Sequence, residues 1–178
     1  MKTQATYILR LALTLLVITA VVAAALAGVN AITAPRIAAA KAEKTQQAIE
    51  AVLPGGGTAM EDFTDPTGLV QAVYTSDSGY AVQVTPAGFD GTIDMMVGIS
   101  KEGKVLNISI ISHTETAGLG AVAAAKTSAG EAFRNQFGQS DAPYAVGDNV
   151  DALTGATITS KAVTDGVNAA VEFVKNLG

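Results

Sequence analysis

Residues 93–111 have the sequence IDMMVGISKEGKVLNISII, and this stretch decides the fold. Both of its halves are rich in β-branched residues and show partial alternation of apolar and polar side chains, which is typical of strands. Between the halves lies Lys101-Glu102-Gly103-Lys104, a turn in which the glycine can adopt a positive φ. We therefore predict that strands 93–100 and 105–111 pair as an antiparallel hairpin.

The segments around this hairpin complete the predicted domain. Residues 80–85 are predicted to form a further strand, and residues 120–126 and 129–137 short helical pieces, with Phe133 and Phe137 buried on one face. A final helix is expected over residues 158–177, with Ser160 capping its amino terminus. Its apolar stripe consists of Ala162, Val163, Val167, Ala170, Val171 and Val174. The fold class predicted is α+β, an antiparallel sheet with packed helices.

The amino-terminal segment is uncharged from Leu11 to Pro35. At 1.5 Å per residue, such a helix can cross a hydrocarbon core of about 30 Å, so we predict a single transmembrane helix. A cleaved signal peptide is the alternative, but its apolar core of about 7 to 15 residues would be shorter. Basic residues lie on both sides of the span, so their count does not decide its orientation.

Three parts follow along the chain: a membrane anchor over residues 1–35, a helical stalk with a glycine-rich hinge over residues 36–57, and a domain over residues 58–178. We expect Pro35 to end the span and Pro54 to follow the end of the stalk helix. Small or polar residues in the span are candidates for contacts with other membrane helices. These are Thr14, Thr19, Gly28 and Asn30.

The composition excludes several classes of function. The formal net charge is −5, so no basic surface for nucleic acid is expected. The chain has no cysteine and one histidine, His113, which excludes disulfides, iron–sulfur clusters and the usual zinc sites, and we predict no metal site. No layout of nucleophile and base is visible, so we predict no catalytic residue, and any redox chemistry would need a bound cofactor.

Residues 112–120, SHTETAGLG, directly follow the second strand of the hairpin. They combine the only histidine with a carboxylate, hydroxyls and two glycines. Such a loop suits a planar heteroaromatic ligand, because glycines let backbone N–H groups approach closely. An ordinary polar turn is the alternative.

Residues 150–161, VDALTGATITSK, directly precede the last helix. Their hydroxyl groups gather at a helix amino terminus, where free N–H groups and the helix dipole favour a phosphate. This position predicts a phosphate-bearing ligand. A Ser/Thr-rich helix cap with no ligand is the alternative.

The two segments together carry a family resemblance. Residues 151–157, DALTGAT, resemble the S(T)GAT flavinylation motif of FMN-binding domains, and residues 113–120 resemble the H-x-E-T-P-G-L-G stretch of the same family. With the membrane segment ahead of them, they resemble the G subunits of Rnf electron transport complexes, which are related to the C subunits of sodium-translocating NADH:quinone reductases. One departure is Ala117, which stands where the family commonly has proline.

The resemblance implies that FMN is attached through its phosphate to Thr157 by a flavin transferase of the ApbE type. Thr159 and Ser160 offer neighbouring hydroxyls, and only the motif register favours Thr157. The other residues that the resemblance implies in cofactor binding are Asp151, Thr154, Gly155, Ala156 and Ser160 for the phosphate turn, and His113, Glu115, Thr116, Gly118, Leu119 and Gly120 for the flavin ring.

The function implied is electron relay within an ion-translocating ferredoxin:NAD oxidoreductase complex. Other Rnf-type subunits and membrane lipid would be its partners, and the FMN domain would lie on the outer face of the cell membrane. Two alternatives stay open. One is a stand-alone, membrane-tethered FMN electron-transfer protein, and the other is an anchored binding domain with no cofactor, in which both motifs are turns.

Overall fold

The structure, a computed structural model, describes residues 2–65 and 67–177. Its internal contacts divide the chain into two units, Met1–Glu43 and Lys44–Gly178. Helix α1, Lys2–Val52, begins in the first unit and ends in the second.

The first unit consists of the apolar part of α1. Among the described residues, this is the one helix long and apolar enough to span a membrane. Its large apolar side chains are exposed, as at Leu16 with 62%. The hydroxyls of Thr14 and Thr19 donate to Arg10 O and Leu15 O, both at 2.9 Å. Pro35 lies inside α1, so the helix continues through the residue expected to end the span.

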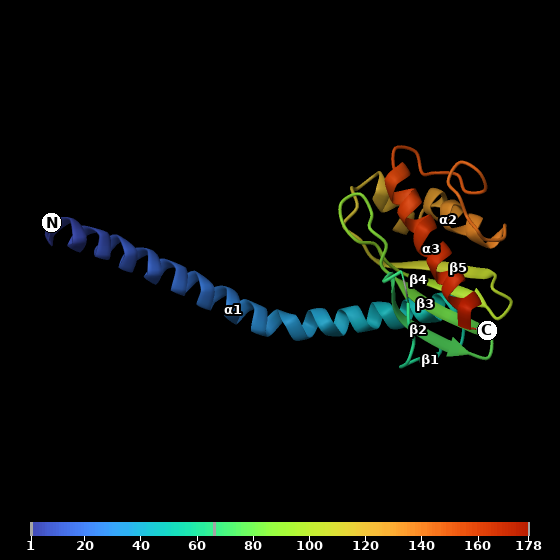
Figure 1. The fold of residues 1–178 in the computed structure, drawn as a ribbon, viewed down its shortest axis with the longest axis horizontal. Coiled ribbons are helices and arrows are strands. Elements are labelled where there is room, and N and C mark those ends of the chain that lie inside the picture. The colour runs from blue at the N-terminus through green and yellow to red at the C-terminus, as the bar shows by residue number, and fades with distance from the viewer. Residues whose placement is uncertain (1, 66, 178) are drawn as a thin grey trace. The chain divides into compact units, whose positions relative to one another are not determined.

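The second unit is built on a five-stranded antiparallel sheet in the order β1-β2-β3-β4-β5 (Figure 1). The predicted hairpin is confirmed: Val97 pairs with Ile108, and Gly103 in the connecting turn has φ +81°. Strands β1 and β2 were not predicted from the sequence. The strands are β1 (Thr58–Ala59), β2 (Val70–Ser76), β3 (Gly79–Val84), β4 (Asp94–Ser100) and β5 (Val105–Ser112).

One face of the sheet packs against α3, Thr157–Leu177, which lies across β3 and β4 (Figure 1). The predicted apolar stripe of α3 is buried, with Val163 and Val167 fully inaccessible. Phe133 and Phe137 are also buried, and their rings meet edge to face at 5.7 Å. The short helical pieces are η1 (Gly120–Ala124), α2 (Ser128–Asn135) and η2 (Gln136–Gly138).

The other face of the sheet is covered by the end of α1. Ile49 and Val52 form a buried cluster with Ala81 and Met96. Gly98 has no room for a Cβ, because the carbonyl oxygen of Val52 occupies that space. Strand β4 is therefore buried on both sides, which explains why its sequence alternates so weakly. Residues 48–53 thus pack within the folded unit, while the division into anchor, stalk and domain stays a prediction.

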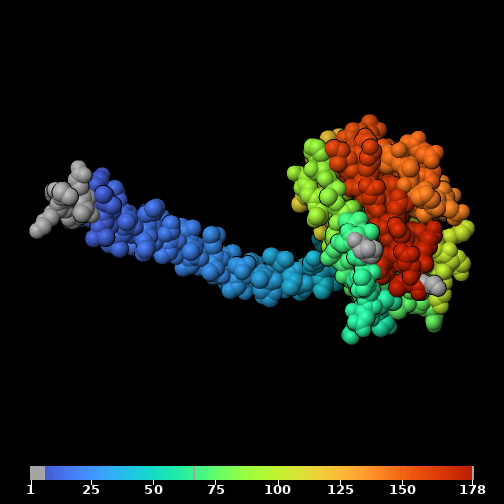
Figure 2. All heavy atoms as spheres, viewed as in Figure 1, coloured from blue at the N-terminus to red at the C-terminus, as the bar shows by residue number. Residues whose placement is uncertain are grey.

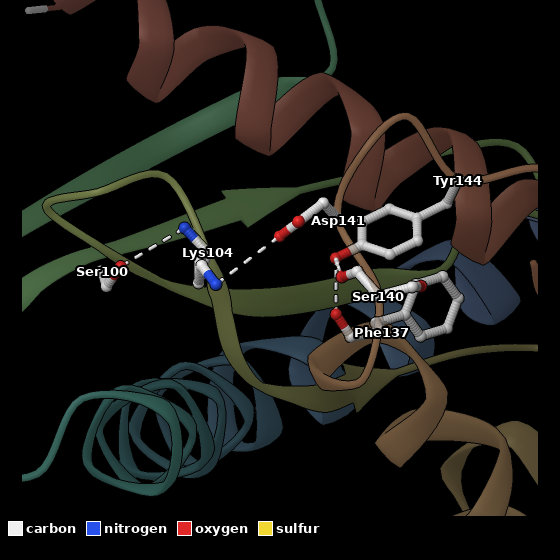
Figure 3. Close-up of polar contacts among 6 residues, drawn as sticks. All are labelled: Ser100, Lys104, Phe137, Ser140, Asp141 and Tyr144. Carbon is white, nitrogen blue, oxygen red and sulfur yellow. Dashed lines mark hydrogen bonds and ion pairs between the residues drawn. The ribbon is translucent and has the colours of Figure 1, made fainter.

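A tyrosine fixes the connection between η2 and α3. The hydroxyl of Tyr144 lies 2.5 Å from the carbonyl oxygen of Phe137 and 3.0 Å from that of Ser140 (Figure 3). Burial raises the pKa of Tyr144, and the nearby charge of Asp141 acts in the same direction. Lys104 and Asp141 approach to 3.9 Å, but both are exposed, so this pair adds little stability. Tyr144 therefore anchors the loop that leads to the start of α3.

Candidate functional site

The two glycine-containing segments meet at one pocket of about 340 Å³. Seven of its ten lining residues belong to the predicted site set, and Phe89, Ile158 and Thr159 are additional. The lining consists of Phe89, Glu115, Thr116, Leu119, Gly120, Gly155, Ala156, Thr157, Ile158 and Thr159. The predicted residues outside the lining are His113, Gly118, Asp151, Thr154 and Ser160.

A tight turn leads into α3 at one side of the pocket. Ala156 N donates to Leu153 O at 3.0 Å, and Gly155 adopts φ +72°, a conformation that favours glycine. Ser160 lies in the first turn of α3, where its hydroxyl accepts from Leu153 N and donates to Ala156 O, each at 2.9 Å. The predicted cap role of Ser160 is therefore wrong, because the helix already begins at Thr157. Ser160 instead fastens the turn to the helix.

The hydroxyl-bearing residues of this segment differ sharply in accessibility. Thr154 and Thr157 are exposed, whereas Thr159 is 2% exposed and Ser160 is fully buried. The hydroxyl of Thr159 donates to the Glu115 carboxylate. Of the three hydroxyl-bearing residues in the first turn of α3, Thr157 and Thr159 line the pocket, and only Thr157 is exposed to solvent.

Glu115 is a buried carboxylate that lines the pocket, 7% exposed. Its Oε1 accepts from Phe89 N at 2.9 Å and from Asp90 N at 3.2 Å. Its Oε2 accepts the bond from Thr159. Glu115 therefore links three segments of chain, a role that its place in the sequence motif did not reveal.

A second turn presents Leu119 to the pocket. Leu119 N donates to Thr116 O at 3.2 Å, and Gly118 adopts φ +77°. Ala117 occupies the second position of this turn, where proline is favoured when the third residue has a positive φ. His113 lies before the turn, and its buried Nδ1 has no hydrogen-bond partner among the described residues.

Asp151 lies away from the pocket, beside α2. Its backbone N–H donates to the side-chain oxygen of Gln136 at 2.7 Å, and its carbonyl accepts from the amide nitrogen of Gln136 at 3.2 Å. The side chain of Asp151 is exposed. Within the structure this residue fixes the start of the motif segment and does not contact the pocket.

Three of the residues that line the pocket are exposed and apolar. Phe89 is 66% exposed, Ile158 54% and Leu119 44%. Figure 2 shows the yellow-green loop that carries Phe89 beside the orange-red start of α3. Ile158 directly follows the motif, so sequence proximity could have indicated it, and Thr159 was expected only as a neighbouring hydroxyl. Phe89 lies in the connection between β3 and β4, and no sequence signal pairs it with either motif.

The pocket combines two chemical surfaces. Leu119, Ile158 and Phe89 offer apolar contact to a planar ring, and its volume lies at the lower end of the range of small-molecule sites. The start of α3 offers free N–H groups beside the hydroxyl of Thr157, and its first turn contains no acidic residue. A ligand with an aromatic ring and a phosphate matches both surfaces.

Comparisons with known families agree with this geometry. The model of the FMN-binding domain matches residues 88–172. The model of the RnfG N-terminal region matches residues 1–52. The first match contains both segments of the pocket, and the second covers α1.

Curated relatives that are similar to the chain include three G subunits. The G subunit of the Na⁺-translocating ferredoxin:NAD⁺ oxidoreductase complex of Acetobacterium woodii is 33% identical over 192 residues, covering 96% of this chain and 93% of the relative. The G subunit of an ion-translocating oxidoreductase complex of Methanosarcina acetivorans is 32% identical, covering 94% of each chain. The G subunit of the proton-translocating ferredoxin:NAD⁺ oxidoreductase complex of Clostridium ljungdahlii is 46% identical over 102 residues, about half of either chain.

Proposed function

This chain belongs to the family of G subunits of Rnf-type ion-translocating oxidoreductase complexes, and we propose that it is a membrane-anchored flavoprotein that relays electrons within such a complex. The observation that carries the proposal is the meeting of residues 115–120 and 155–159 at one pocket, with an accessible threonine at its edge. FMN is the cofactor, in keeping with the matched FMN-binding domain.

The phosphate of FMN is joined to Thr157 as an ester. Accessibility supports this choice, because the competing hydroxyls of Thr159 and Ser160 are buried and hydrogen-bonded. A flavin transferase of the ApbE type would use FAD as donor. In the transfer, the Thr157 hydroxyl oxygen attacks the flavin-side phosphorus of FAD, the phosphoanhydride bond breaks, AMP leaves and the hydroxyl proton is released.

The residues around Thr157 suit a phosphate. The amino terminus of α3 supplies unpaired N–H groups and the positive end of a helix dipole. Gly155 lets the chain turn closely before the helix, and Ser160 holds that turn in place. The phosphate would therefore be held by backbone donors at the start of α3.

The flavin ring would lie over the apolar part of the pocket. When bound, FMN supplies the redox chemistry, and the protein supplies binding, orientation and local electrostatics. Leu119 and Ile158 would contact the ring, and their exposed positions leave one side of the pocket open to a redox partner. An open edge is what an electron carrier needs, because no substrate has to be enclosed.

The partners of this protein are the other subunits of the complex. Relatives bear the names of proton-translocating and Na⁺-translocating ferredoxin:NAD⁺ oxidoreductase subunits, and this chain would take the same place. Helix α1 would fix the flavin domain to the membrane and dock against integral membrane subunits, with lipid covering its remaining apolar side chains. We place the domain on the outer face of the membrane, in line with the resemblance.

Intact-mass spectrometry tests the proposal. The full chain is produced in cells with and without a flavin transferase, and peptide mapping follows. The expected result is a mass increase of one FMN less water, located at Thr157 and present only with the transferase. An unmodified chain under both conditions would overturn covalent attachment.

The membrane side has a separate test. Because the chain contains no cysteine, a Ser78→Cys variant carries a single thiol at an exposed turn. A membrane-impermeant maleimide should label this variant in intact cells or spheroplasts. Labelling only after lysis would place the domain on the inner side and contradict the proposal.

A further inference from the structure

The connection between β3 and β4 forms a tight projection beside the pocket. Ile93 N donates to Pro86 O at 2.9 Å, and Gly88 N donates to Gly91 O at 2.6 Å. Phe89 stands at the tip, 66% exposed, and lines the pocket. A large aromatic side chain is thus held in solvent by an ordered backbone.

Two side chains of the motif after β5 bind this tip. The hydroxyl of Thr114 donates to Asp90 O at 2.6 Å. The carboxylate of Glu115 accepts from the backbone N–H groups of Phe89 and Asp90. The backbone on both sides of the Phe89–Asp90 peptide bond is therefore tied to the motif.

The same carboxylate reaches the first turn of α3. Its second oxygen accepts from the hydroxyl of Thr159, two residues after Thr157. Two glycines make the space that the carboxylate occupies, since a Cβ on Gly88 or Gly120 would collide with its oxygens. Glu115 is thus enclosed by three segments that all line the pocket.

We propose that Phe89 is a contact for the flavin ring and that Glu115 is a positioning residue, which clamps the tip of the 86–91 loop to the start of α3. This inference rests on the proposed occupation of the pocket by FMN. Packing of the phenyl ring on the flavin removes apolar surface of both from water, and offset or edge-on aromatic contact adds to this gain. Because the tip is already ordered, little conformational entropy is lost on binding.

Limited proteolysis of the flavin-free full chain in detergent tests the clamp alone. Chymotrypsin cleaves after aromatic residues, and the accumulation of fragments 1–89 and 90–178 is followed by mass spectrometry. Glu115→Ala should speed this cleavage severalfold, because the amides of Phe89 and Asp90 lose their acceptor. Glu115→Gln keeps one acceptor oxygen and should lie between wild type and Glu115→Ala.

The matched control is Glu172→Gln, which changes an exposed carboxylate of α3 outside the pocket. It should leave the rate of cleavage after Phe89 unchanged. Equal cleavage rates in Glu115→Ala and wild type would overturn the clamp, whether or not FMN is attached to Thr157.

Flavin fluorescence tests the contact. The chain has no tryptophan, so Phe89→Trp introduces a single indole, which quenches flavin emission by electron transfer only at close contact. We expect a severalfold loss of emission and a shortened lifetime in the FMN-loaded Phe89→Trp variant. Adding Glu115→Ala to it should restore much of the emission, because the 86–91 loop is then no longer held beside the flavin. Emission would stay quenched if Glu115 stabilised the domain without positioning this loop.

The control for this measurement is Leu106→Trp, at an exposed position on β5. It lies at the opposite end of the strand from the motif, roughly 20 Å away at 3.3 Å per residue. Its flavin emission should equal that of wild type. If the wild-type mass shows no covalent FMN, the same variants are titrated with free FMN. Absence of the ester is then distinguished from absence of contact between residue 89 and the flavin. Unquenched FMN in the Phe89→Trp variant would overturn the contact.

Discussion

The two segments that form the pocket are built in opposite ways. Residues 113–120 turn their acidic side chain inward, where Glu115 binds the 86–91 loop and α3. Residues 153–160 turn two hydroxyls inward, at Thr159 and Ser160, but leave Thr157 accessible at the pocket edge. The first segment therefore holds the pocket together, and the second presents the hydroxyl that we propose is modified. Within one motif, burial separates the residues that support the pocket, Thr159 and Ser160, from Thr157, the residue proposed to react.

The largest expected effect comes from Thr157→Ala. It removes the accessible hydroxyl, so covalent FMN should be lost completely. The domain should stay folded, because the Thr157 side chain is exposed and forms no hydrogen bond with the residues that the structure describes. Intact mass after production with the flavin transferase measures this. Thr154→Ala, at the other exposed threonine, is the control and should keep its FMN. Covalent FMN on the Thr157→Ala variant would contradict the assignment.

Gly120→Ala should lower the free energy of unfolding by disturbing the packing of residues 113–120 around Glu115. The added Cβ would meet the Thr159 hydroxyl and the Glu115 carboxylate, and such overpacking costs roughly 1–3 kcal/mol. Urea unfolding followed by near-ultraviolet circular dichroism measures the loss of free energy of unfolding. Gly138→Ala is the control, because its Cβ would make only an ordinary contact of 3.6 Å with Val105 O. Equal stability of the two variants would contradict the close fit around Glu115.

Parts of this arrangement could be predicted from the sequence because the signals are local. The hairpin of β4 and β5 follows from two β-rich runs and a turn glycine, and α3 follows from its apolar stripe. Strand β2 was missed although its residues also favour strands, and a register shift between Val70 and Ala72 breaks its alternation. The two residues of β1 form a strand only through pairing with β2.

The rest depends on contacts between distant segments. Phe89 reaches the pocket only because β3 and β4 pair and project the loop between them. The sequence motif indicated Glu115 as a ring contact, but its bonds to Phe89, Asp90 and Thr159 exist only in the folded domain. The packing of the end of α1 on the sheet likewise needs Gly98, because a side chain there would collide with Val52. The sequence alone does not show that these two residues meet.

Ser160→Ala tests whether Ser160 only stabilises the turn before α3 or also takes part in FMN attachment. The variant removes the acceptor of Leu153 N and a donor to Ala156 O, so we expect a loss of about 1 kcal/mol in the free energy of unfolding. Covalent FMN should still be attached at Thr157. Urea unfolding and intact mass on the same preparation measure both effects. A folded Ser160→Ala variant without FMN would show that Ser160 takes part in the modification itself.

Ala117→Pro should have the smallest effect and the opposite sign. Ala117 stands second in the Thr116–Leu119 turn, ahead of a glycine with positive φ, where the fixed φ of proline fits. Proline restricts the unfolded chain, so the variant should gain about 0.4–1 kcal/mol in free energy of unfolding, with FMN attachment unchanged. Ala117→Gly, which loosens the unfolded chain, should lose stability in the same urea measurement. A less stable Ala117→Pro variant would mean that Ala117 does not hold the φ that proline requires, and that this turn supports Leu119 by a different backbone geometry.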